Sequence, residues 1–166
     1  MTTIVALVVL GPLIEEMMFR GWLSGTWQAL ISTAAFLAVF YTGPPFAKDL
    51  IDAPLLVSQL VLSALSLAFV YALTLNHPWR PIRGFERLFP LMFWGQGIVF
   101  GALHFGNFHS DMIALPLLMT LPLVVCAWLW DYARVILGLP ASLVLHIACN
   151  VPSAVGIVVV MGTRAS

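Results

Sequence analysis

Charged residues are scarce in this chain of 166 residues: they make up 8% of it, against 61% hydrophobic residues. A soluble domain carries about 25% charged and about 45–50% apolar residues, so the composition excludes an ordinary soluble domain. The apolar content equally excludes a disordered chain. Seven basic and seven acidic side chains give a net charge of zero. The sequence therefore lacks the basic surface that nucleic acid requires, and we expect no nucleic-acid partner.

Cysteine is scarce as well. Cys126 and Cys149 lie inside apolar runs, where a free thiol behaves as a small hydrophobe, and their spacing is not that of a cysteine-based metal site. The first apolar run lacks the basic start of a signal peptide and leads into Glu15 and Glu16 rather than into small residues. These absences favour a single membrane-embedded domain over residues 1–166.

The apolar residues form runs of the length of membrane-spanning helices, which need about 20 residues to cross the hydrocarbon core. Hydropathy and turn residues place six helices at residues 3–23, 27–42, 55–75, 89–106, 112–131 and 140–161. The predicted fold class is all-α, a polytopic transmembrane helical bundle of about six spans. The second run is short and carries Ser32 and Thr33, so the alternative is that residues 27–42 do not cross the membrane.

Basic residues are concentrated at one end of the predicted helices. These are Arg20, Arg80, Arg83, Arg87 and Arg134, whereas Lys48 and Arg164 fall at the other end. The positive-inside rule then places the arginine-rich end in the cytoplasm and the N-terminus outside.

Several residues near the predicted span ends are interpreted as interfacial. Asp131 and Arg134 are expected to form an interfacial ion pair, and His77 and His109 to be solvated. The tryptophans of this kind are Trp22, Trp79, Trp94, Trp128 and Trp130.

Two of the three glutamates, Glu15 and Glu16, are adjacent within the first predicted span, where each ionisable side chain costs about 2.5–3.5 kcal/mol. Arg20 follows Glu16 by one helical turn, which predicts a Glu16–Arg20 ion pair. Neighbouring helical residues point about 100° apart, so Glu15 faces elsewhere and is available to accept a proton. A helix-end salt bridge is the structural alternative, but it does not require a second carboxylate.

Two further polar pairs interrupt apolar runs. Phe100 and His104 are four residues apart in the fourth predicted span, and His146 and Asn150 are four apart in the sixth, so each pair shares a helical face. One such histidine alone is most often a hydrogen-bond partner between helices, and Phe100 alone would be core packing. Combined with the glutamates, these pairs place polar groups on three helices, which a bundle can bring together at one site.

These side chains support hydrolysis by an activated water. A carboxylate in a low-dielectric interior is a stronger base than one in water, so Glu15 beside a neutral histidine could deprotonate a water held between them. His146 and Asn150 could donate hydrogen bonds to the oxyanion that forms on the attacked carbonyl. A zinc-based version, with Glu15, His104 and His146 as ligands, is the alternative, and no other cofactor is indicated.

Other intramembrane protease motifs are absent from the sequence. No histidine is followed by glutamate as in H-E-x-x-H, and no aspartate occurs in a Gly-x-Gly-Asp context. The pair Ser24-Gly25 lacks the glycine two residues before the serine that a rhomboid-type motif needs.

Three motifs in order resemble those of the CPBP family of intramembrane proteases. They are Glu15-Glu16-x-x-x-Arg20 with the following Gly21-x-Leu23, then Phe100-x-x-x-His104, then His146-x-x-x-Asn150. The family takes in type II CAAX prenyl endopeptidases, Abi-type bacteriocin-immunity proteins and lysostaphin-resistance-like proteins. The resemblance spans residues 15–150, nearly the whole chain.

The resemblance implies an all-helical membrane domain with a glutamate-dependent active site. Glu15 and His104 would activate water, and His146 and Asn150 would hold the oxyanion, while the ion pair of the first motif supports the site. A metal-free mechanism is the version we favour. The substrate would be a membrane-associated protein or peptide, CAAX-like or other, and membrane lipids would surround the protein.

The chain departs from the family pattern in two ways. Family members commonly place helices before the glutamates, and the distance from Arg20 to Phe100 leaves room for two extra spans, so we expect a shortened start or an insertion at residues 27–75. The six-span order also places Glu15 and His146 in the cytoplasmic halves of their spans and His104 in the opposite half. A break in the fourth span at its glycines, or a second run that does not cross, would remove this conflict.

We therefore expect an intramembrane endopeptidase, integral to a bacterial cytoplasmic membrane. Two alternatives from other classes remain. A proton-coupled transporter would use the glutamates and histidines as a proton relay. A non-catalytic immunity or scaffold protein would function without Glu15. The oligomeric state is not indicated by the sequence.

Overall fold

The computed structural model describes residues 6–42, 53–74, 80–108 and 113–164. Within these ranges the elements are η1 (Ala6–Leu10), α2 (Gly11–Arg20), α3 (Trp27–Thr42), α4 (Ala53–Thr74), α5 (Phe85–His104), η2 (Phe105–Asn107), α6 (Ala114–Leu137) and α7 (Leu139–Arg164). Among the described residues the only β-type pairing is an isolated bridge between Thr26 and Pro81. The predicted all-α fold is confirmed. Of the residues interpreted from the sequence, Lys48, His77, Trp79 and His109 lie outside the described residues.

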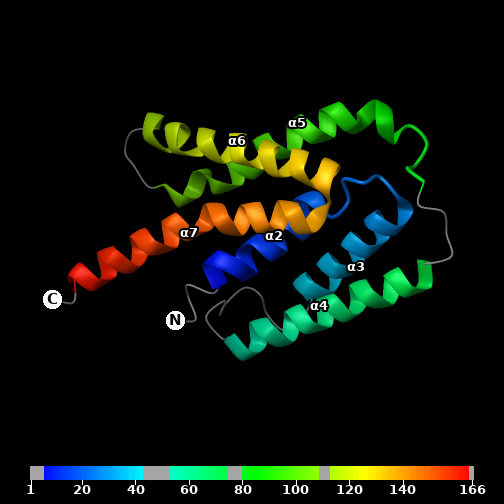
Figure 1. Ribbon diagram of the computed structural model, residues 1–166, viewed down its shortest axis with the longest axis horizontal. Helices are drawn as coiled ribbons and strands as arrows, with labels where there is room; N and C mark the ends of the chain where they lie inside the picture. Colours follow the sequence, from blue (N-terminus) through cyan, green and yellow to red (C-terminus); the bar gives the residue numbers. More distant parts are fainter. Residues whose placement is uncertain (1–5, 43–52, 75–79, 109–112, 165–166) are drawn as a thin grey trace.

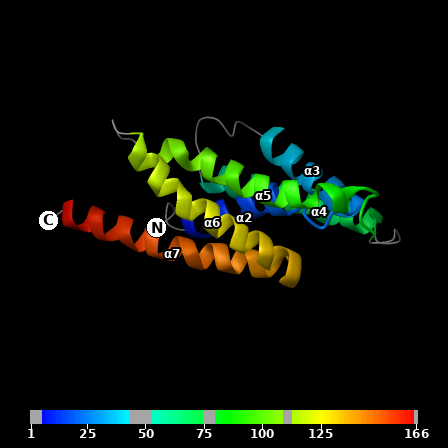
Figure 2. The ribbon, with the colours of Figure 1, turned by 90° about the horizontal axis from the view of Figure 1, so that it is seen from above.

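The helices run alternately in opposite directions. In Figure 1, α5 and α6 lie along one long edge, α3 and α4 along the opposite edge, and α2 and α7 between them. Figure 2 shows α7 and α3 on opposite sides of α2. The ends of α2, α4 and α6 and the starts of α3, α5 and α7 share one end of the molecule, the right-hand end in Figure 1. This end is the one for which the sequence predicts the cluster of arginines.

The predicted helix positions are largely confirmed, with differences at several ends. The first predicted span is divided into a π-helical turn, η1, and a short α2 that ends at Arg20. The fifth continues to Leu137, beyond its predicted end at Asp131. The boundary at a charged residue was wrong, since a charge that finds a buried partner does not end a helix.

The composition of the helices is that of a membrane protein. Three stretches among the described residues are long and apolar enough to cross a membrane: Phe85–Asn107, Ala114–Leu137 and Leu139–Gly156. Large apolar side chains cover their outer faces, with exposed fractions of 73% for Leu91 and 70% for Leu137. Such faces are suited to contact with lipid rather than water.

Glycines with positive φ set the turns at the arginine-rich end. Gly84, with φ +85°, precedes α5, and Gly138, with φ +95°, separates α6 from α7. The Gly138 N–H donates to the carbonyl of Arg134 at 3.1 Å, which closes α6 before Pro140. Because only one residue separates them, α6 and α7 lie side by side in antiparallel directions.

Close packing of α5 against α6 depends on two glycines of the fourth predicted span. A Cβ atom on Gly97 would overlap the Trp128 side chain, and one on Gly101 would overlap Val124. The helix is continuous from Phe85 to His104, so a break at these glycines, one of the two alternatives that would remove the depth conflict, is not observed. They serve close approach between helices instead.

The core has two parts, and α2 contributes to both. Met17 packs with Phe36 and Phe40 of α3, whereas Phe19 packs with Phe100 and the residues Ala127 and Trp130 of α6. Apolar contacts on two faces hold α2 between the other helices, and its glutamates are thereby fixed inside the bundle.

Candidate active site

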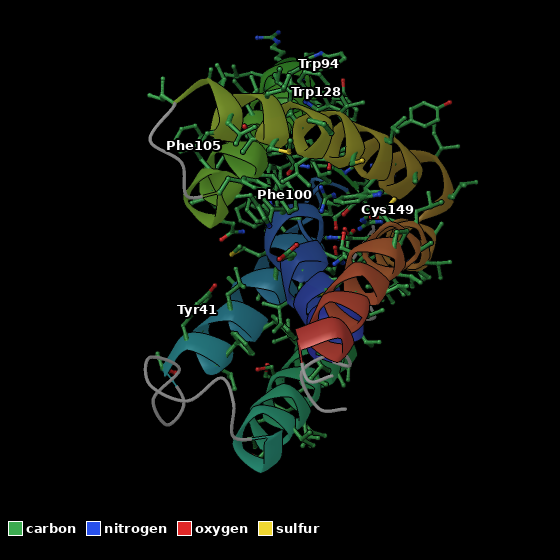
Figure 3. All side chains as sticks on the ribbon, turned by 90° about the vertical axis from the view of Figure 1, so that its left-hand side faces the viewer. Tyr41, Trp94, Phe100, Phe105, Trp128 and Cys149 are labelled. Atoms are coloured by element: carbon green, nitrogen blue, oxygen red, sulfur yellow. The ribbon has the colours of Figure 1, made fainter. Side chains whose placement is uncertain are left out.

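The candidate site lies where α2, α5 and α7 meet. Figure 3 looks along the bundle and shows Phe100 at the centre, beside α2 and between the α5–α6 pair and α7. Glu15 lies between two histidines: its Oε1 is 3.8 Å from His104 Nε2, and its Oε2 is 3.3 Å from His146 Nε2. The Glu15 side chain is 28% exposed and that of His104 is 25% exposed. A carboxylate and two imidazoles thus meet at a partly open position.

The separation between Glu15 and His104 that the six-span order implies is not observed, because Glu15 Oε1 lies 3.8 Å from His104 Nε2. The chain continues beyond Arg20 through the turn at Gly21–Gly25 before Thr26 pairs with Pro81. The Ile82 N–H also donates to the carbonyl of Gly25 at 2.9 Å. The end of α2 is therefore set back from the connection that leads into α5, which brings Glu15 level with His104.

The predicted ion pair between Glu16 and Arg20 is present. Arg20 Nη1 donates to Glu16 Oε1 at 2.7 Å, and both side chains are buried. His146 Nδ1 lies 2.9 Å from the same oxygen, and the hydroxyl of Ser142 donates to Glu16 Oε2. Glu16 thus has three hydrogen-bond partners inside the bundle, whereas Glu15 faces the open side. The two adjacent carboxylates therefore have different surroundings, as the angle of about 100° between neighbouring helical residues predicts.

Arg20 has a second buried carboxylate partner that the sequence interpretation assigned elsewhere. Its Nε donates to Asp131 Oδ1 at 2.7 Å, and both side chains are fully buried. The interfacial pair of Asp131 with Arg134 is thus wrong: Arg134 Nε donates to the backbone carbonyl of Arg20 at 3.0 Å. The guanidinium of Arg20 also lies over the rings of Phe100 and Trp130, 5.3 and 5.1 Å from their centroids.

His146 is held in place by a contact of a ring nitrogen and by stacking of its ring face. Its Nδ1 faces Glu16, and because a carboxylate oxygen only accepts, Nδ1 is the donor when that oxygen carries no proton. The imidazole stacks on Trp130 with centroids 3.8 Å apart and planes 16° apart. Trp130 is 3% exposed, so its interpretation as an interfacial aromatic is wrong. These contacts direct Nε2 of His146 toward Glu15.

His104 is oriented by its own helix. Nδ1 lies 2.8 Å from the carbonyl oxygen of Phe100, which can only accept, so Nδ1 carries the proton. In a neutral ring Nε2 is then an acceptor, and it faces Glu15. The Phe100 ring lies 4.4 Å from the imidazole, centroid to centroid. Phe100 therefore supports His104 through both its carbonyl and its ring.

Asn150 lies one helical turn beyond His146 on α7 and is half-buried. It shares the helical face of His146, as the spacing predicts. The part of the chain that the structure describes contains no group of three or more His, Cys, Asp or Glu residues able to hold a metal ion.

Sequence reasoning missed three residues of the site, and two of them carried a signal. Ser142 precedes His146 by four residues and so lies on its face, a spacing that extends the motif by one turn. Asp131 is an acid inside a strongly apolar run, where a buried partner is required. Trp130 follows an apolar run like the other tryptophans, and nothing in the sequence separates it from them.

Replacing Ser142 by alanine is expected to lower the free energy of unfolding by about 1.5–3 kcal/mol, the contribution of a hydrogen bond to a charged group. The matched control is Ser153→Ala, because Ser153 is exposed on the same helix. Denaturation of both variants in the same detergent measures the difference. Equal stability of the two variants would show that the Ser142 bond to Glu16 contributes nothing.

Residues 1–83 match the family described as type II CAAX prenyl endopeptidase Rce1-like. This half of the chain contains Glu15, Glu16 and Arg20, and the two histidines and the asparagine follow it. Comparison with curated proteins gave no match. Comparison with solved structures gave none either.

Proposed function

The chain belongs to the type II CAAX prenyl endopeptidase Rce1-like family, and we propose that it cleaves a membrane-associated protein with a water activated by Glu15 and His104. One observation carries the proposal: the Glu15 carboxylate lies between the Nε2 atoms of two histidines at a partly exposed position. The substrate is a membrane-associated protein or peptide, CAAX-like or other, cut near the membrane face.

Water activation follows from the acceptors at this position. A water beside Glu15 can donate one hydrogen to Oε1 and the other to His104 Nε2, since both atoms accept. Glu15 takes the proton as the water oxygen bonds to the carbonyl carbon of the peptide. When the C–N bond breaks, the same proton passes from Glu15 to the leaving nitrogen. His104 orients the water and stays neutral.

The developing oxyanion is stabilised from α7. His146 donates from Nε2 when both ring nitrogens are protonated, with Nδ1 directed at Glu16. Asn150, one turn away, donates from its amide in any protonation state. Donors that are held in place by the fold need no reorganisation when charge develops.

Replacing Asn150 by alanine is expected to lower kcat about 10²–10³-fold, the usual effect of removing one oxyanion donor. KM should change little, because the hydrogen bond to the oxyanion forms only as charge develops. Cys149→Ala is the neighbouring control, since Cys149 is an exposed residue of the same helix. A kcat for Asn150→Ala equal to that of the Cys149 variant would remove Asn150 from the oxyanion site.

The membrane topology belongs to the same proposal. We place six spans in a bacterial cytoplasmic membrane, with the arginine-rich end in the cytoplasm. The alternating helix directions support this order (Figure 1), and the bond between Arg134 and the Arg20 carbonyl supports a shared end for these arginines. No step of the proposed mechanism uses a metal.

Comparison of new protein N-termini in membranes that contain the wild type or His104→Ala tests the activity. We expect cleavages that occur only with the wild type, because Glu15 alone does not hold the water. Leu103→Ala is the control, since Leu103 is 63% exposed beside His104. Identical N-termini in all three membranes would reject the endopeptidase and favour the transporter, tested by proton flux in liposomes, or a scaffold protein.

A further inference from the structure

A cavity of about 460 Å³ lies at the arginine-rich end of the bundle, apart from the candidate active site. It is formed where α2 ends, α5 begins and α6 ends, at the right-hand end in Figure 1. Its apolar walls are Leu23, Pro81, Phe85, Phe89 and Val135. Its polar groups are Ser24, Glu86 and Arg134. We refer to it below as the Arg134 cavity.

Arg134 is the only cation that lines this cavity among the described residues. It is half-buried, and its hydrogen bond to the Arg20 carbonyl uses Nε alone, which leaves the two Nη groups of the guanidinium available. None of the ion pairs among the described residues includes Arg134 or Glu86. A guanidinium removed from water without an acidic partner is stabilised by an added anion, and its planar fork matches the oxygens of a phosphate.

We propose that the Arg134 cavity binds the phosphodiester headgroup of a membrane phospholipid, with Arg134 contacting the phosphate. The apolar walls then hold the glycerol backbone and the start of an acyl chain. The hydroxyl of Ser24 adds a donor to the phosphate, and Glu86 at the start of α5 accepts from a hydroxyl or ammonium of the headgroup. Three exposed arginines lie close in the sequence to the cavity residue Glu86: Arg80, Arg83 and Arg87. Their positive charge attracts anionic lipid surfaces to this end of the bundle.

The position of the cavity argues against a peptide substrate as its occupant. Phe89 and His104 are separated by fifteen residues of one helix, or about 22 Å. The C-terminal tripeptide of a CAAX-type substrate spans at most about 10 Å. The side chains of Arg20 and Trp130, which are both buried, also lie between Glu15 and the Arg134 cavity. The tripeptide that a cut at Glu15 would release therefore does not reach the cavity, whereas a lipid headgroup reaches it from the interface.

Binding of phosphatidylglycerol to the purified, delipidated protein in detergent, followed by native mass spectrometry, tests the proposal. We expect Arg134→Gln to weaken binding at least about tenfold, which corresponds to about 1.4 kcal/mol. Val135→Trp should weaken it equally, because the indole fills the cavity while Arg134 remains. Arg87→Gln is the matched control and should stay within about twofold, since Arg87 does not line the cavity.

Wild-type affinity in Val135→Trp overturns the proposal even if Arg134→Gln fails to fold. An equal loss in Arg87→Gln also overturns it, because the attraction would then be general. Three competitors separate the possible ligands. If diacylglycerol binds as tightly as phosphatidylglycerol, the phosphate contact is excluded. If glycerol 3-phosphate displaces phosphatidylglycerol at matching affinity, the cavity is a site for a soluble phosphate. If a C-terminal tripeptide displaces phosphatidylglycerol, the cavity is a peptide site.

Discussion

Glu15→Gln is expected to lower the turnover of the enzyme at least about 10³-fold while the protein still folds and inserts. Glutamine keeps the size and the hydrogen-bonding oxygen of glutamate but cannot take a proton from water, and positioned bases contribute about 10²–10⁴-fold. The side chain is 28% exposed and belongs to no buried ion pair with arginine, so its replacement leaves the Arg20 network intact. The measurement is the cleavage rate of a substrate identified from wild-type-specific N-termini, with the protein in liposomes.

A second variant separates the chemistry of Glu15 from its position. Glu15→Asp keeps a carboxylate but withdraws it by one methylene from the histidines, so its rate should fall between those of the wild type and Glu15→Gln. Protein level and thermal stability in detergent should be equal for all three proteins. A wild-type rate in Glu15→Gln would exclude Glu15 as the base. The scaffold interpretation predicts that the protein keeps its function when Glu15 is replaced.

Local spacing predicted most of the site because helical geometry is regular. The four-residue separations within Glu16–Arg20, Phe100–His104 and His146–Asn150 each define a shared face, whatever the rest of the bundle does. The structure brings Glu15, His104 and His146 together on three helices. What spacing does not define is the relative depth of those helices. That depth depends on the turn at residues 21–25, which the sequence interpretation had counted partly as helix.

The ion-pair partners of buried charged residues are a second feature that the sequence does not predict. Asp131 lies three residues before Arg134, so the nearest opposite charge was taken as its partner. In the fold, α6 crosses α2 so that Asp131 meets Arg20, more than a hundred residues away in the chain. Local pairs are favoured in an unfolded or exposed helix, but a buried carboxylate is satisfied by whichever cation the packing of helices brings to it. Sequence proximity carries little information about that packing.

Arg20→Met is expected to have the largest effect on stability of any substitution in this network. Methionine fills similar volume but leaves two buried carboxylates, Glu16 and Asp131, without their arginine. Breaking one buried ion pair costs about 3–5 kcal/mol, a large share of a total stability of about 5–15 kcal/mol. We expect little folded protein in the membrane, measured as yield and as thermal stability in detergent. Arg87→Met, at an exposed position of α5, is the matched control and should retain wild-type yield.

Removal of the two unpaired charges distinguishes the electrostatic cause from loss of packing. If burial of Glu16 and Asp131 without a cation destabilises Arg20→Met, then adding Glu16→Gln and Asp131→Asn should recover part of the yield. If the arginine matters mainly through its contacts with the rings of Phe100 and Trp130, the triple variant should remain as poor as the single one. An Arg20→Met protein as abundant and thermostable as the wild type would contradict both the electrostatic and the packing explanation. Because Arg20 reaches Glu15 only through Glu16 and His146, its contribution to catalysis is to fix the imidazole that faces the carboxylate.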